Sequence, residues 1–91
     1  METEKRIAQK KLELKAAWTA YQAAEGSAGD ALELLRKARA AANTSPSQAT
    51  VGLVSTARAT YEELNADAAR KGVRLDKISA ELAALQENQQ S

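Results

Sequence analysis

Two long runs of helix-forming residues meet at Asn43-Thr44-Ser45-Pro46, near the middle of the chain. Proline is favoured in the first turn of a helix, where its missing N–H has no partner to lose. Ser45 is a typical N-cap residue, and Gln48 follows three residues later, as in a capping box. Asn43 is suited to end the preceding helix in a left-handed conformation. The sequence therefore predicts a tight turn at residues 43–45 and a second helix that begins at Pro46.

Beyond this turn, apolar residues recur in alternating steps of three and four. This mean spacing of about 3.5 residues is that of a left-handed coiled coil. The pattern predicts a second arm over residues 46–87, roughly 60 Å long at 1.5 Å per residue, and a frayed tail at 88–91. The positions in this frame are Val54, Ala57, Tyr61, Leu64, Ala68, Lys71, Leu75, Ile78, Leu82 and Leu85, of which only Lys71 is charged.

The segment before the turn follows the same rule and predicts a first arm over about residues 3–42. Two glycines at 26 and 29 interrupt its helix-forming composition, and each costs roughly 1 kcal/mol relative to alanine. The heptad frame nevertheless passes through them without a slip, so we expect a kink or short break near 26–29 that keeps the direction of the chain. The frame positions are Ile7, Lys10, Leu14, Ala17, Tyr21, Ala24, Ala28, Ala31, Leu35, Ala38 and Ala42.

Two such arms joined by a tight turn predict an all-α fold, a single helical domain over residues 1–91 that forms a coiled-coil-like antiparallel hairpin. Facing positions are expected to be those whose residue numbers sum to 92, which pairs Leu14 with Ile78 and Ala17 with Leu75. A register shifted by one heptad is the alternative. The alternative architecture is a three-helix bundle, in which residues 28–42 fold back as a separate short helix.

The composition excludes several classes of protein. The chain has no cysteine and no histidine, which excludes zinc fingers, iron–sulfur sites, disulfide scaffolds and Ser-His-Asp triads. The sequence holds no glycine-rich phosphate loop and no nucleophile-elbow motif. Glu62 and Glu63 are adjacent, so on a helix their carboxylates point about 100° apart and cannot share one site. We therefore expect no enzymatic activity, no metal and no cofactor.

Apolar residues outside the heptad frame predict a second contact face. Trp18 and Leu32 share one flank of the seam, and Leu34 and Leu53 occupy the other. They can widen the seam into an ordinary apolar stripe or form an interface with another copy or a target. Two helices alone cannot enclose a tryptophan, which favours the interface. The candidate interface residues are Leu12, Trp18, Leu32, Leu34, Val51, Leu53 and Val73; Val51 extends the set near the turn, and Leu12 and Val73 lie farther round.

The region around the turn is basic. Between Leu34 and Tyr61 the chain has four cations and no acid, although its overall net charge is only +1. Such a tip beside a helix N-terminus can receive a phosphate, but clusters of this kind are more often solvated faces. The candidate phosphate contacts are Arg36, Lys37, Arg39 and Arg58.

These patterns favour a non-enzymatic protein–protein interaction module that self-associates and acts as an adaptor, assembly factor or small inhibitor. Its size and alanine content are typical of small phage or bacterial accessory proteins. One alternative is a nucleic-acid-associated protein that uses the basic tip; another is a structural subunit of a larger helical assembly. A charged N-terminus, no lipidation motif and no long apolar run predict a cytoplasmic chain without membrane contact.

Overall fold

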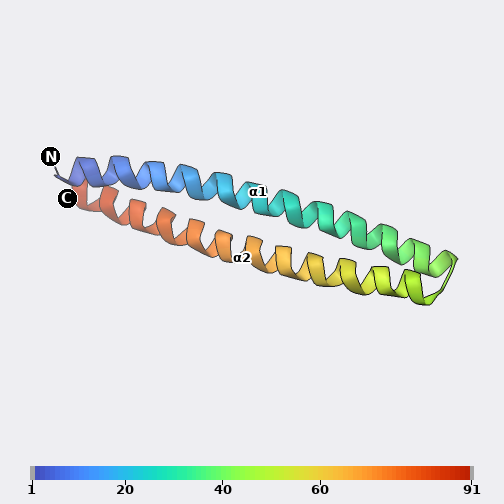
Figure 1. Cartoon of the computed structure of the whole chain (residues 1–91). Coiled ribbons are helices and arrows are strands. Elements are labelled where there is room, and N and C mark those ends of the chain that lie inside the picture. Colours follow the sequence, from blue (N-terminus) through green and yellow to red (C-terminus); the bar gives the residue numbers. More distant parts are fainter. Residues whose placement is uncertain (1, 91) are drawn as a thin grey trace.

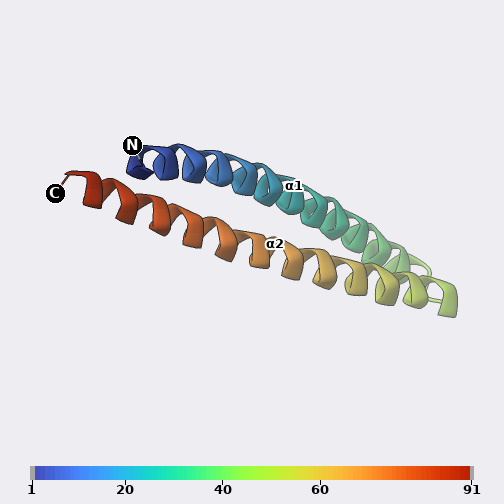
Figure 2. The same ribbon diagram turned by 60° about the vertical axis from the view of Figure 1, so that its left-hand side comes forward.

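Two long antiparallel helices make up the computed structural model, which describes residues 2–90 (Figure 1). Helix α1 spans Glu2–Thr44 and helix α2 spans Gln48–Gln90. They form a rod of 66 × 15 × 13 Å, in which the start of α1 and the end of α2 lie at the same end. The two helices also lie side by side in a second view (Figure 2). This confirms the predicted all-α hairpin, and the three-helix alternative is wrong because residues 28–42 belong to α1.

Helix α1 runs through both of its glycines without interruption. The first arm keeps its direction as predicted, but the predicted break near residues 26–29 is wrong. Gly26 and Gly29 face away from α2, and an added Cβ at either position would meet no atom within 4 Å. The neighbouring Ala24 and Ala28 are buried against α2. Their packing holds the turns of helix on either side, which offsets the low helix propensity of glycine.

The connection between the helices comprises residues 45–47, and Ser47 caps α2. The Thr50 backbone N–H donates to Ser47 Oγ over 3.1 Å, and the Ser47 N–H donates back to Thr50 Oγ1 over 2.9 Å. This is a capping box with Ser47 at the N-cap and Thr50 three residues later. The predicted box of Ser45 and Gln48 is therefore wrong by two residues, and Pro46 lies before the N-cap instead of in the first turn.

The end of α1 also differs from the prediction. Asn43 is helical, and no residue between 2 and 90 has a positive φ. Two carbonyls near the end of α1 have donors: Ser45 N–H donates to the Ala41 carbonyl and Thr44 Oγ1 to the Ala40 carbonyl, each over 2.9 Å. The helix therefore ends in a regular turn without a left-handed residue. At the other end, α2 extends through residues 88–90 of the predicted tail, and Ser91 lies outside the described residues.

The predicted seam is the contact surface of the two helices, since every position in both heptad frames is buried or half-buried. The predicted register also agrees with the cross-helix contacts. Lys10 Nζ donates to Glu81 Oε2 over 2.8 Å, and Tyr21 lies against Gly72. A shift by one heptad would separate both pairs by about 10 Å along the axis.

The core along this seam is thin. Nine apolar residues are buried, and five of them are alanines. The remaining four, Ile7, Leu35, Ile78 and Leu82, are the only large side chains buried among the described residues. Larger seam residues such as Leu14, Tyr61 and Leu75 are half-buried. Two helices therefore cover the middle of the seam and leave its flanks open.

Candidate interaction surfaces

The hairpin has two flanks, one on each side of the seam. Near the turn, Leu34 and Leu53 line one groove, and Trp18 lines another farther along the rod with Leu75 and Asp76. We call the first side the leucine flank and the second the tryptophan flank. Leu34 and Leu53 share one groove and Trp18 lines another. Trp18 and Leu32 each follow a seam position by one residue, whereas Leu34 and Leu53 each precede one, so helix geometry assigns the two pairs to opposite sides.

The leucine flank is most apolar near the turn, in a groove of about 460 Å³. Leu34 and Leu53 face this groove from the two helices and are 61% and 58% exposed. Alanine and threonine side chains form most of its remaining wall, and Lys37 is its single charged residue. The full lining is Ala31, Leu34, Lys37, Ala38, Ala41, Leu53, Thr56, Ala57 and Thr60.

The same flank continues toward the chain ends. Glu13, Ala16 and Ala20 line a further groove together with Arg74, and these four positions lie three heptads from residues of the tip groove. Here the surface is polar: Lys10 Nζ contacts Glu13 Oε2 over 2.9 Å as well as Glu81. Two carboxylates thus share one ammonium at this end of the flank.

The Lys10–Glu81 pair changes the titration of both groups. The hydrogen bond from Lys10 holds the pKa of Glu81 below its ordinary value, and the hydrogen bond to Glu81 raises the pKa of Lys10. Both shifts favour the charged pair. Because the two residues belong to different helices, the pair links α1 to α2 in the register of the seam.

On the tryptophan flank, Trp18 packs against Tyr21, with ring centroids 6.0 Å apart and planes tilted by 35°. Tyr21 lies across Gly72, where an added Cβ would be 3.1 Å from Tyr21 Cε1. The carboxylate of Glu25 accepts a hydrogen bond from the Tyr21 hydroxyl and raises its pKa. Trp18 remains 48% exposed. Sequence reasoning missed the role of Gly72; its position one residue after the seam Lys71, opposite Tyr21, was the available signal.

The four basic tip residues do not form one cluster. Arg39 and Arg58 line a single groove on the tryptophan flank with Asn43. Lys37 lies on the leucine flank, and Arg36 contacts Glu33 over 3.7 Å. The structure thus brings two of the four predicted phosphate contacts together.

Three other predicted interface residues differ in placement. Val51 lies near the turn on the tryptophan flank, where it lines the groove of Arg39 and Arg58. Leu12 and Val73 are each 70% exposed and lie outside the grooves described above. Leu32 is half-buried and widens the seam.

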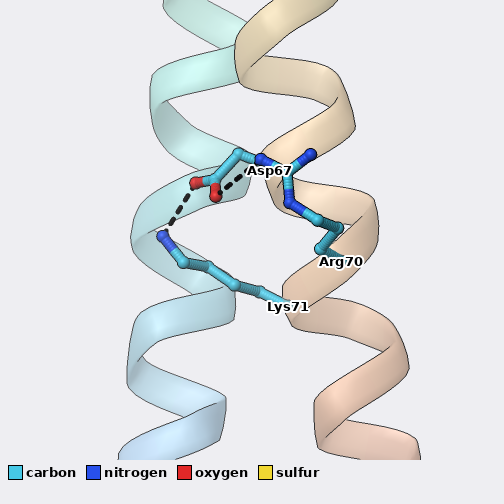
Figure 3. Close-up of polar contacts among 3 residues, drawn as sticks. All are labelled: Asp67, Arg70 and Lys71. Carbon is cyan, nitrogen blue, oxygen red and sulfur yellow. Dashed lines mark hydrogen bonds and ion pairs between the residues drawn. The ribbon is translucent and has the colours of Figure 1, made fainter.

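An ion-pair cluster on α2 explains how a lysine occupies the seam (Figure 3). Lys71 Nζ contacts Asp67 Oδ2 over 2.7 Å, and Arg70 contacts Asp67 Oδ1 over 3.3 Å. The hydrogen bond from Lys71 is the main cause that lowers the pKa of Asp67. The ammonium of this seam lysine is thus paired with a carboxylate one turn earlier on its own helix.

Among residues 2–90, no three acidic side chains come together in a group that could hold a metal ion. Neither described helix has an apolar stretch long enough to cross a membrane. No family model matches the chain, and neither a curated protein nor a solved structure matches it.

Proposed function

We propose that the protein is a self-associating interaction module, which acts by binding other helical surfaces along the flanks of its hairpin. One observation carries this proposal: the folded chain leaves far more surface in contact with water than a compact protein of its mass. The accessible surface is 6690 Å², whereas a compact monomer of this mass exposes about 5,100 Å².

The difference, about 1,600 Å², is the size of an entire standard protein–protein interface, to which each partner contributes about half. A second pair of helices would cover seam residues that α1 and α2 leave half-buried, such as Leu64 and Leu85. Four helices enclose a core that two cannot, which is why bundles of this kind are common. Exposed leucines on a helical rod are typical of such contact faces.

Light scattering with size-exclusion chromatography tests the proposal. At micromolar concentration we expect at least twice the chain mass of 9.7 kDa. We also expect the midpoint of thermal unfolding to rise with protein concentration, because association stabilises the folded state by mass action. A monomeric mass with a concentration-independent midpoint would contradict the proposal. Mass that grows continuously with concentration would favour the structural subunit of a larger assembly.

One observation favours a second candidate function. Arg39 and Arg58 come from different helices and line one groove with Asn43, which provides two guanidinium groups for one phosphate. A gel-shift titration against a short DNA duplex at several salt concentrations tests nucleic-acid binding. If it binds, replacing both arginines by glutamine should flatten the dependence on salt; binding with an unchanged salt slope would exclude this groove.

A further inference from the structure

We propose that a second copy of this chain docks on the leucine flank, with the two hairpins parallel, their turns at the same end, and α1 of each copy opposite α2 of the other. This inference rests on the proposed self-association and names its face and direction. The charges near the turn favour the leucine flank over the tryptophan flank. The area that a stable dimer needs favours a contact along the whole rod over one at its tip. The residues that would lie against the leucines favour the parallel over the antiparallel direction.

The chemistry of the two flanks selects the face. Lys37 is the single charged residue among the nine that line the tip groove of the leucine flank. Its long aliphatic stem can lie along apolar surface while the ammonium reaches water. At the same end of the rod, the groove of the tryptophan flank is lined by two cations, Arg39 and Arg58, and by no acid. A second copy on that flank with its turn at the same end would have to desolvate these arginines and bring like charges together.

Surface area selects the extent of the contact. The tip groove reaches from Ala31 to Ala41 on α1, about 15 Å at the rise of a helix. The whole rod is 66 Å long. A stable dimer covers about 800 Å² on each copy. The rod is only 15 Å wide, so a contact confined to the tip groove would cover much less than this area. The copies must therefore overlap along most of their length.

If the copies overlap along most of their length, the direction of the dimer depends on which residues of the second copy lie against Leu34 and Leu53. In an antiparallel dimer the tip of one copy lies against the open end of the other. Leu34 and Leu53 would then be buried against the charged cluster of Lys10, Glu13 and Glu81, at a large desolvation cost. In the parallel dimer the tip groove meets its own copy, and Leu34 on α1 faces Leu53 and Thr56 on the opposing α2.

The charges farther along the flank fit the parallel direction. Glu13 on α1 lies at the same height as Lys77 on α2, which is three heptads beyond Thr56. Opposing copies would therefore place each Glu13 beside the other copy's Lys77. Ala16 and Ala20, also on this flank, leave room for the stem of the opposing Arg74. Asp30 and Glu63 would lie near each other, but both are exposed and can turn toward water.

Disulfide trapping between single-cysteine variants tests the face and the direction, because the chain has no cysteine of its own. Lys37→Cys and Thr56→Cys proteins are mixed, oxidised mildly and weighed by mass spectrometry. We expect mixed disulfide dimers between the two variants, because both positions line the tip groove on different helices. Gln22→Cys mixed with Ala69→Cys is the matched control at exposed positions on the tryptophan flank.

The outcomes separate this inference from the proposed function. If light scattering gives a dimer but only the control pair crosslinks, the face is wrong and self-association stands. If Lys37→Cys crosslinks to Gln9→Cys, which lies near the open end of the rod, and not to Thr56→Cys, the dimer is antiparallel and the direction is wrong. A monomeric mass without any crosslink would overturn both proposals.

A pair of double variants provides an independent measurement. Leu34→Gln with Leu53→Gln should raise the dimer dissociation constant about tenfold or more, since each 1.4 kcal/mol of lost contact is a factor of ten. Leu12→Gln with Val73→Gln removes two apolar side chains that are at least as exposed but lie outside the grooves of the leucine and tryptophan flanks. This double variant should leave the dimer dissociation constant unchanged. Circular dichroism checks that both proteins stay helical. Equal weakening by both pairs would contradict the assignment of the face.

Discussion

At the scale of single residues, the four glycines differ in their surroundings although their effect on helix propensity is the same. Gly26, Gly29 and Gly52 have open space where a Cβ would lie, whereas Gly72 lies against the ring of Tyr21. The first three therefore only lower helix propensity. Gly72 has a packing reason, because the aromatic ring fills the space that a side chain would take.

We predict that Gly52→Ala stabilises the protein by about 0.5–1 kcal/mol, since alanine loses less backbone entropy than glycine in a helix. Gly72→Ala is the matched variant on the same helix. Its added methyl would be 3.1 Å from Tyr21 Cε1, so the ring must move and we expect a smaller gain or a loss. Urea unfolding of both variants measures the difference, and equal gains would show that the Tyr21 contact has no energetic effect.

The Lys10–Glu81 pair predicts a loss of stability in acid. Its hydrogen bond holds the pKa of Glu81 below the ordinary value of 4.5, so the carboxylate contributes above that value and its contribution disappears as pH falls through the lower, folded pKa. The raised pKa of Lys10 acts in the opposite direction: its contribution is complete below 10.5 and disappears as pH rises above the folded pKa.

Glu81→Gln tests this linkage. The variant should be less stable than the parent protein near pH 7, and the difference should shrink as pH falls below about 4. Asp67→Asn is the control, because its partner Lys71 lies on the same helix and its loss does not break a contact between helices. A stability difference that is constant from pH 7 to pH 2 would contradict the assigned pair.

At the scale of the elements, the turn depends on which serine receives the backbone N–H groups of α2. Ser47 Oγ accepts from Thr50, whereas Ser45 contributes through its main chain, donating to Ala41 and accepting from Thr50 Oγ1. Both serines are next to Pro46, so the sequence alone offers two N-cap positions.

We predict that Ser47→Ala costs about 0.5–2 kcal/mol of stability, as expected for loss of an N-cap. Ser45→Ala keeps the two main-chain hydrogen bonds and should change stability by less than about 0.5 kcal/mol. Thermal unfolding followed by circular dichroism compares the two variants. A larger effect at position 45 would restore the capping box that the sequence predicted and exclude the one in the structure.

At the scale of the whole molecule, stability depends on a few large side chains in a seam made mostly of alanine. Ile78 is buried at 7% exposure, and Val73 lies on the outer side of the same helix at 70%. The hairpin is open at both flanks, so a cavity in the seam can partly fill with neighbouring side chains or water.

We predict that Ile78→Ala costs about 2 kcal/mol, the low end of the range for truncating a buried aliphatic side chain. Val73→Ala should cost under about 0.5 kcal/mol. Chemical unfolding at one fixed protein concentration measures both, which matters because association adds to apparent stability. If the two substitutions cost the same, the seam does not supply the main packing energy of the fold.

The sequence by itself determined the hairpin and the heptad seam, and it favoured the register that the cross-helix contacts then confirmed over one shifted by a heptad. The hairpin and the seam follow from the 3.5-residue period and from the turn at Pro46, which residue spacing and local chemistry fix before any contact forms. It also separated Trp18 and Leu32 from Leu34 and Leu53, because helical geometry alone assigns them to opposite flanks.

Only the tertiary structure decided the remaining features. The continuity of α1 through Gly26 and Gly29 depends on burial of its alanines against α2, a term that helix propensity does not contain. Ser47, and not Ser45, is the N-cap of α2 because the connection must cross from the end of α1 to the start of α2 before the second helix can begin. The contact of Tyr21 with Gly72 and the separation of Lys37 from Arg39 and Arg58 require both helices at once, since each groove is built from side chains of two segments that only packing brings together.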